Sequence, residues 1–102
     1  MHLPTLLTAV LAGASVSAYK VTLYKNTGFS GTSKSYTTAG SKSLSFNARS
    51  WKWSSPVGEG CCVRFCYNGK DVGYRCGSDS NTKSSSAIDK VVLGCGSATL
   101  KC

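Results

Sequence analysis

One stretch decides the fold of this chain: Val21-Thr-Leu-Tyr-Lys-Asn-Thr-Gly-Phe-Ser-Gly31. Apolar and polar side chains alternate at its start, which is typical of a strand with one buried face. The alternation breaks at Asn26-Thr-Gly28, a turn sequence, because glycine adopts a positive φ without a Cβ clash. We therefore expect a hairpin folded back on itself, in which Tyr24 stacks on Phe29 and Gly31 lets the backbones approach closely.

The hairpin pattern returns later in the chain, in Val63-Arg-Phe-Cys-Tyr-Asn-Gly69. Apolar and polar residues alternate again, and the Asn-Gly pair favours a tight turn. Aligning Cys66 with Tyr24 places Gly73 on Gly31, so the same interval from strand residue to glycine recurs. The sequence thus predicts two copies of one strand unit.

Each copy ends with a serine followed by an apolar strand. The first is Ser50-Trp-Lys-Trp-Ser54, and the second runs from Ser84 to Leu93. Alternation places Trp51 and Trp53 on one face of their strand, where they could form core or stack on a sugar or a membrane headgroup. Burial in a core is the more frequent environment for such a pair, and we expect it here.

These features resemble the Greek-key motif of βγ-crystallins. In that motif a tyrosine is followed later by a glycine, and an aromatic residue stands two positions before that glycine. A serine opens the last strand of the motif. The resemblance implies an all-β, disulfide-stapled fold in which two Greek-key motifs, residues 19–57 and 61–95, form a small eight-strand sandwich with a short extension to residue 102. In the second copy Cys66 replaces the tyrosine, and Asp71 or Val72 stands at the aromatic position. The fold-defining residues are then Tyr24, Phe29, Gly31, Ser50 and Gly73.

The resemblance also raises the question of calcium, which some βγ-crystallins bind through a short motif rich in Asn, Asp and Ser. Ser80-Asn-Thr-Lys-Ser-Ser85 matches that motif without its first acidic residue, and Phe46-Asn-Ala-Arg-Ser-Trp51 lacks both ends of it. Calcium needs several oxygen ligands with carboxylate charge among them, whereas these loops carry Lys83 and Arg49. We expect no calcium site and no other cofactor.

The N-terminal residues are typical of a secretory signal. Residues 1–18 combine an apolar run, too short to span a bilayer, with the small-residue cleavage pattern Val16-Ser-Ala18. No later apolar run is long enough for a membrane span. We expect a secreted, extracellular, monomeric domain of residues 19–102.

The cysteines indicate a disulfide framework. An even number in a short secreted chain predicts three disulfides, and six cysteines allow 15 pairings. We suggest Cys66–Cys76 as one bridge, across the tight Asn-Gly turn. Zinc bound by Cys61, Cys62 and Cys66 is the alternative, disfavoured by an oxidising compartment and the lack of a nearby histidine. The cysteines are Cys61, Cys62, Cys66, Cys76, Cys95 and Cys102.

The residues needed for common enzyme chemistry are scarce. The one histidine, His2, falls within the predicted signal, which excludes Ser-His-Asp and Cys-His nucleophile systems from the secreted domain. The acids are Glu59, Asp71, Asp79 and Asp89, and none of them forms a sequence pattern typical of an acid–base pair. We expect no catalytic residue and no enzymatic activity.

Positive charge is concentrated in the first half. Residues 19–57 hold six basic residues and no acid, whereas residues 58–102 hold six basic and four acidic ones. Such a surface attracts an anionic partner through its long-range field, although a basic protein can also be merely soluble. A secreted chain seldom meets nucleic acid, so we do not expect that partner. The candidate binding residues are Lys20, Lys25, Lys34, Lys42, Arg49 and Lys52.

Three classes of function fit these features. In size, basicity and cysteine content the chain is similar to the antimicrobial βγ-crystallin-like proteins, which include yeast and Streptomyces killer toxins and plant antimicrobial peptides; this implies binding to a microbial cell wall or membrane. A secreted host-interaction or structural protein without killing activity is the second class. The third is a metalloproteinase inhibitor that acts on a protein partner through the loop Ser54-Ser-Pro-Val-Gly-Glu-Gly60, because a Streptomyces inhibitor has this fold.

Overall fold

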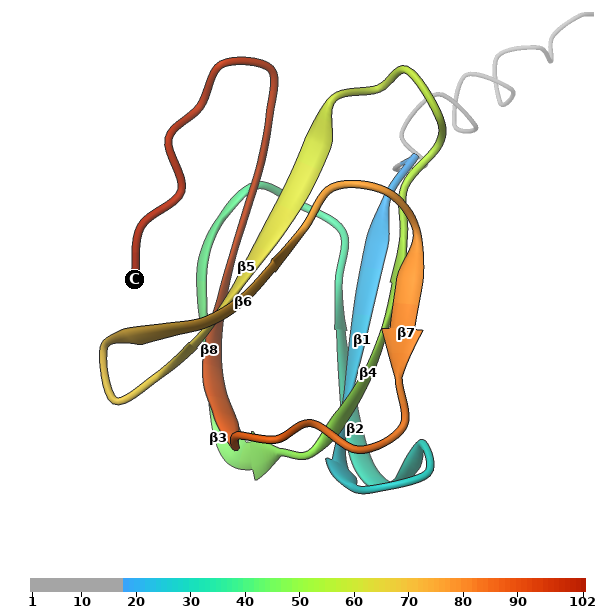
Figure 1. The fold of residues 1–102 in the computed structure, drawn as a ribbon, viewed down its shortest axis with the longest axis vertical. Coiled ribbons are helices and arrows are strands. Elements are labelled where there is room, and N and C mark those ends of the chain that lie inside the picture. The colour runs from blue at the N-terminus through green and yellow to red at the C-terminus, as the bar shows by residue number, and fades with distance from the viewer. Residues whose placement is uncertain (1–17) are drawn as a thin grey trace, which may run out of the picture.

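The structure, a computed structural model, describes residues 18–102 and is all-β in that range (Figure 1). The predicted signal therefore lies outside the described residues except for its last one, and residues 18–102 contain no apolar helix of membrane-spanning length. The strands are β1 (Lys20–Asn26), β2 (Ser30–Tyr36), β3 (Gly40–Ala48), β4 (Ser50–Ser54), β5 (Cys61–Tyr67), β6 (Lys70–Arg75), β7 (Asp79–Asn81) and β8 (Ile88–Cys95).

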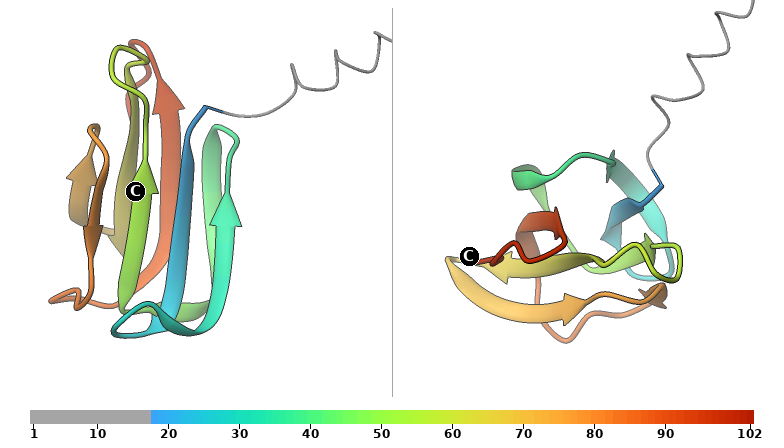
Figure 2. Two further views of the ribbon diagram at one scale, coloured as in Figure 1. Left: turned by 90° about the vertical axis from the view of Figure 1, so that its right-hand side faces the viewer. Right: turned by 90° about the horizontal axis from the view of Figure 1, so that it is seen from above.

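The strands form two antiparallel sheets that face each other (Figure 2). The strand order is β2-β1-β4-β7 in the first sheet and β3-β8-β5-β6 in the second. Each sheet takes three strands from one half of the chain and its remaining strand from the other half: β3 crosses into the second sheet and β7 into the first. The two halves therefore interlock through this exchange and share one core.

The core lies between the sheets and is built by alternating residues of the central strands. Val21 and Leu23 of β1 are fully buried, and Trp51 stacks on Phe65 of the opposite sheet with 4.4 Å between ring centroids. Trp53 is also buried, whereas Lys52, between the two tryptophans, is exposed. The prediction that the tryptophan pair belongs to the core is confirmed.

The first hairpin folds back on itself as expected, with one difference. The rings of Tyr24 and Phe29 are in contact, with 5.6 Å between their centroids. Gly31 has a φ of +82°, and a Cβ on it would lie 2.5 Å from Nδ2 of Asn26. The residue that approaches Gly31 is therefore Asn26. Because glycine has no Cβ, the Asn26 amide can lie against the backbone of Gly31.

The second hairpin is of a different kind. Asn68 and Gly69 have φ values of 52° and 78°, as a two-residue hairpin turn of type I′ requires. Gly73 does not have a positive φ, and it lies opposite Phe65 in the β5–β6 pair. Gly73 is thus a site of close packing and does not reproduce the backbone role of Gly31, in contrast to the equivalence suggested by the sequence.

The six cysteines form three disulfides: Cys61–Cys95, Cys62–Cys76 and Cys66–Cys102. The three-disulfide prediction is confirmed, but the suggested Cys66–Cys76 bridge is wrong. The two-residue turn places Cys66 opposite Asp71. A register shift between Phe65 and Cys66 then brings Cys76 beside Cys62, at the far end of the hairpin.

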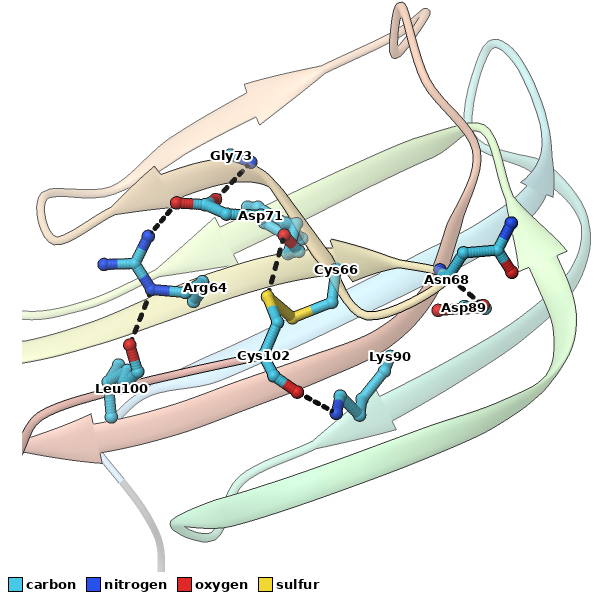
Figure 3. Close-up of a disulfide and its surroundings, with 10 residues drawn as sticks. Arg64, Cys66, Asn68, Asp71, Gly73, Asp89, Lys90, Leu100 and Cys102 are labelled. Carbon is cyan, nitrogen blue, oxygen red and sulfur yellow. Dashed lines mark hydrogen bonds and ion pairs between the residues drawn. A yellow bond between two sulfur atoms is a disulfide. The ribbon is translucent and has the colours of Figure 1, made fainter.

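The Cys66–Cys102 disulfide fixes the C-terminal segment to the outer face of the second sheet (Figure 3). Leu100 is buried there with Val92 in a small cluster of its own. The Arg64 Nε donates to the Leu100 carbonyl at 2.7 Å, and Lys90 Nζ donates to the Cys102 carbonyl at 2.5 Å. The C-terminal segment therefore covers the part of this face around Cys66 and Val92.

Valine substitutions should separate the roles of three glycines. We expect Gly31→Val to cost about 2 kcal/mol or more, because a left-handed backbone and the Asn26 side chain both oppose it. Gly73→Val should cost about 1–3 kcal/mol, because a Cβ there lies 3.2 Å from Cδ2 of buried Phe65. Gly77, whose Cβ would meet nothing within 4 Å, is the control. Chemical denaturation measures all three, and a Gly31→Val variant as stable as Gly77→Val would contradict the strained turn.

Tryptic mapping without reduction should identify the pairing. Cleavage yields a peptide with Cys61 and Cys62, residues 53–64, which we expect to be linked to two others, residues 76–83 and 91–101. Peptide 65–70, which holds Cys66, should carry only the single residue Cys102. A link between peptides 65–70 and 76–83 would restore the Cys66–Cys76 pairing and disprove the register of the β5–β6 pair.

Candidate functional site

The outer face of the first sheet carries a basic groove. Because Val21, Leu23 and the two tryptophans point into the core, their neighbours along β1 and β4 point outward. Thr22 lies directly opposite Lys52, and Lys20 opposite Ser54. The central strands thus place two lysines and two hydroxyl residues side by side on one surface.

We call this site the lysine groove. It has a volume of about 340 Å³, is open to solvent, and is lined by Lys20, Thr22, Tyr24, Lys52, Trp53 and Ser54. Its shape follows from side-chain length: Thr22 and Ser54 are short, whereas the lysines and Tyr24 are long. We therefore call the two short hydroxyl residues the floor of the groove.

The Lys52 ammonium is held above an aromatic pair. Its Nζ lies 4.5 Å from the ring centroid of Phe29 and 5.9 Å from that of Tyr24. A cation over an aromatic face gains about 0.5–1 kcal/mol at an exposed site. The folded first hairpin, which brings Phe29 back over Tyr24, therefore restricts where this charge can lie.

Ser50 holds that hairpin in place. Its side chain is fully buried, and its Oγ donates to the Asn26 carbonyl at 2.6 Å and accepts the Phe29 N–H at 3.0 Å. Phe29 has a φ of 56°, unusual for a residue other than glycine. The serine therefore fixes the strained residue whose ring supports Lys52.

The structure brings together only two of the six predicted binding residues, Lys20 and Lys52. Lys34 lies opposite Leu23, so it is on the other side of β1 and β2, where its Nζ lies 5.7 Å from the Tyr36 ring centroid. Lys25 is exposed at the end of β1, beside a register shift.

The remaining two lie elsewhere. Lys42 is on β3, which has crossed into the second sheet, and donates to Thr38 Oγ1 at 2.9 Å. Arg49 is half-buried and donates to the Ser84 carbonyl at 3.1 Å. The six residues therefore do not lie on one continuous face, and for Lys42 the reason is the strand exchange, which a linear charge count does not include.

Two of the four acids of the second half are paired with arginine. Arg64 forms an ion pair with Asp71, and Arg75 Nε lies 3.0 Å from Asp79. The backbone N–H of Ser80 and then Arg75 hold the pKa of Asp79 below its usual value. Both ion pairs found in residues 18–102 belong to the second half, so Lys20 and Lys52 have no carboxylate partner there.

The sequence also suggested two candidate loops, one for calcium at residues 80–85 and one for a protease at residues 54–60. In the segment of residues 80–85, Asn81 Oδ1 accepts the Lys83 N–H at 3.0 Å, so this amide oxygen is engaged within the loop. Within residues 18–102 no cluster of His, Cys, Asp or Glu could hold a metal ion. The loop at 54–60 presents a fully exposed Val57 on a tight turn, closed by a 3.3 Å bond from the Glu59 N–H to the Pro56 carbonyl.

Removing the Ser50 hydroxyl should loosen the hairpin beneath the groove. We expect Ser50→Ala to cost about 1–3 kcal/mol, because the Phe29 N–H and the Asn26 carbonyl lose their partner in a buried position. Ser54→Ala, on the exposed face of the same strand, should change stability by less than about 0.5 kcal/mol. Urea denaturation compares them, and equal stabilities would mean that the hydroxyl is dispensable.

Comparison with protein-family models, curated proteins and solved structures finds no match to this chain. A function for the chain is therefore inferred from the geometry and charge of the lysine groove.

Proposed function

We propose that this chain is a secreted, non-enzymatic, βγ-crystallin-like protein that binds an anionic polymer at a microbial cell surface and acts there as an antimicrobial or killer-toxin-like protein. The observation that carries the proposal is the lysine groove, in which Lys20 and Lys52 face solvent without an acidic partner among residues 18–102. A partner that supplies negative charge would complete this surface.

The strand arrangement supports the βγ-crystallin-like part of the proposal. The β1–β2 hairpin and β4 lie side by side, and the intervening β3 joins the other sheet; the second half does the same with β7. Such an order is typical of two interlocked Greek keys. The Tyr24–Phe29 contact and the Ser50 hydrogen bonds occur at the positions that the resemblance marked.

Secretion is supported by the cysteine chemistry. Three disulfides in a domain of this size are typical of oxidising compartments, where they compensate for a small core. A secreted protein meets polysaccharide walls and lipid headgroups, many of which are anionic. Opposite charge increases the rate of such encounters, and salt screens the attraction over about 10 Å at 0.1 M.

The alternatives differ in the biological consequence of binding or in the surface that binds. A host-interaction or structural protein could use the same groove without killing cells, so a growth-inhibition assay separates it from a toxin. The inhibitor alternative depends on Val57, which is fully exposed in a loop anchored where Ser55 Oγ donates to the Cys61 carbonyl at 3.4 Å. The tight turn at Val57 gives a protease no extended segment to bind, so this function has less support.

Charge-removal variants test the binding proposal. Replacing Lys20 and Lys52 with Gln should weaken retention on insoluble anionic wall polysaccharide, because each exposed ion pair contributes about 0.2–1 kcal/mol. The matched control replaces Lys70 and Lys83, which are exposed in the second half. Retention of the parent should fall as salt rises from about 0.05 to 0.5 M, over which the screening length shortens severalfold. The groove variant should lose no more stability than about 0.5–1 kcal/mol, the contribution of the Lys52 contact with the aromatic rings, and the control should lose none. Equal losses of retention from the two double variants would overturn the proposed surface.

A further inference from the structure

We propose that the lysine groove is a subsite for an acidic sugar, a hexuronate residue within a polysaccharide chain. This inference rests on the proposed function and specifies its ligand. It is based on three properties of the groove: hydroxyl groups at its floor, point charges beside them, and the absence of exposed apolar anchors on this face.

The floor of the groove suits a ring that carries hydroxyls. Thr22 and Ser54 line it, and the Thr22 Oγ1 lies 2.8 Å from Ser35 Oγ on the next strand. On the other side Ser80 lies opposite Lys52, so hydroxyl residues are present on all four strands of this face. A hydroxyl can both donate and accept, as the hydroxyls of a sugar do.

The charges suit a carboxylate fixed to that ring. Lys20 lies opposite Ser54 and Lys52 opposite Thr22, which makes the lysines diagonal neighbours on adjacent strands, with Cα atoms about 7–8 Å apart. A carboxylate attached directly to a sugar ring can meet an ammonium at the rim while the ring hydroxyls meet the floor.

The groove lacks the features that favour phosphate or sulfate. Such groups are commonly held by arginine forks or by several free backbone N–H groups. None of the six lining residues is an arginine. The lining residues belong to β1 and β4, which pair on both sides within the sheet, so their N–H groups are engaged in its ladders.

A lipid surface is disfavoured by the same face. The large hydrophobic residues exposed within residues 18–102 are Val57 and Tyr74. Val57 is in the loop after β4, and Tyr74 is on β6 of the second sheet. The aromatic rings near the groove, those of Tyr24 and Phe29, are half-buried and lie beneath Lys52. No side chain of the groove is thus placed to insert between acyl chains, as interfacial binding requires.

Amide NMR titration with oligogalacturonate tests the subsite. We expect shifts at the groove, at Lys20, Thr22 and Lys52, and none at the covered face around Leu100. Binding should weaken roughly fivefold to tenfold in Lys20→Gln/Lys52→Gln, which removes two ion pairs. The matched control, Lys34→Gln/Lys42→Gln, removes the same charge from the same half of the chain outside the groove and should bind like the parent.

Three further probes separate ring recognition from charge. The methyl ester of the same oligosaccharide keeps the ring and loses the charge, polyglutamate keeps the carboxylates without the ring, and dextran sulfate carries sulfate on a sugar. We expect all three to bind more weakly than oligogalacturonate. Equal binding of polyglutamate or dextran sulfate would overturn the acidic-sugar subsite and leave the proposed function standing. If the parent protein were retained on no anionic polymer, both the acidic-sugar subsite and the proposed function would be overturned.

Discussion

The buried hydroxyl of Ser50 is the interaction on which the first sheet depends. It bonds to both ends of the folded turn, to the Asn26 carbonyl and the Phe29 N–H. Without it, the strained backbone of Phe29 would have no buried partner to offset its cost. The ring of Phe29 would then lose its position over Tyr24, and the Lys52 ammonium would lose its support. A single serine on a central strand thus connects the core to the charged surface.

The two sheets are stabilised by different means, and the difference leaves one face free. All three disulfides start from β5, in the second sheet, and one of them holds the C-terminal segment over its outer face. The first sheet contains no cysteine and is held by tryptophan packing and by Ser50. Its outer face therefore remains open, and the lysine groove lies on it.

The sequence allowed the local features to be predicted more reliably than the pairings. Alternation around Trp51 and Trp53 was sufficient to predict their burial, and the spacing of Tyr24 and Phe29 predicted their contact, because both depend on neighbours within one strand or turn. The Cys66 pairing failed because the two-residue turn at Asn68 and Gly69 places Cys66 opposite Asp71, so Cys76 lies near the other end of the hairpin. Lys42 was misplaced for a related reason, since only the topology shows that β3 leaves the first sheet.

The effect of the charged residues on a partner depends on which of them form ion pairs with one another. The first half holds six basic residues and no acid. In the second half, Arg64 pairs with Asp71 and Arg75 with Asp79, so these two acids are neutralised locally. Arginine suits this role, since its planar fork matches a carboxylate. The lysines of the groove keep their charge directed at solvent. Lys20 and Lys52 therefore present their charge to a partner on the face of the first sheet, which the C-terminal segment does not cover.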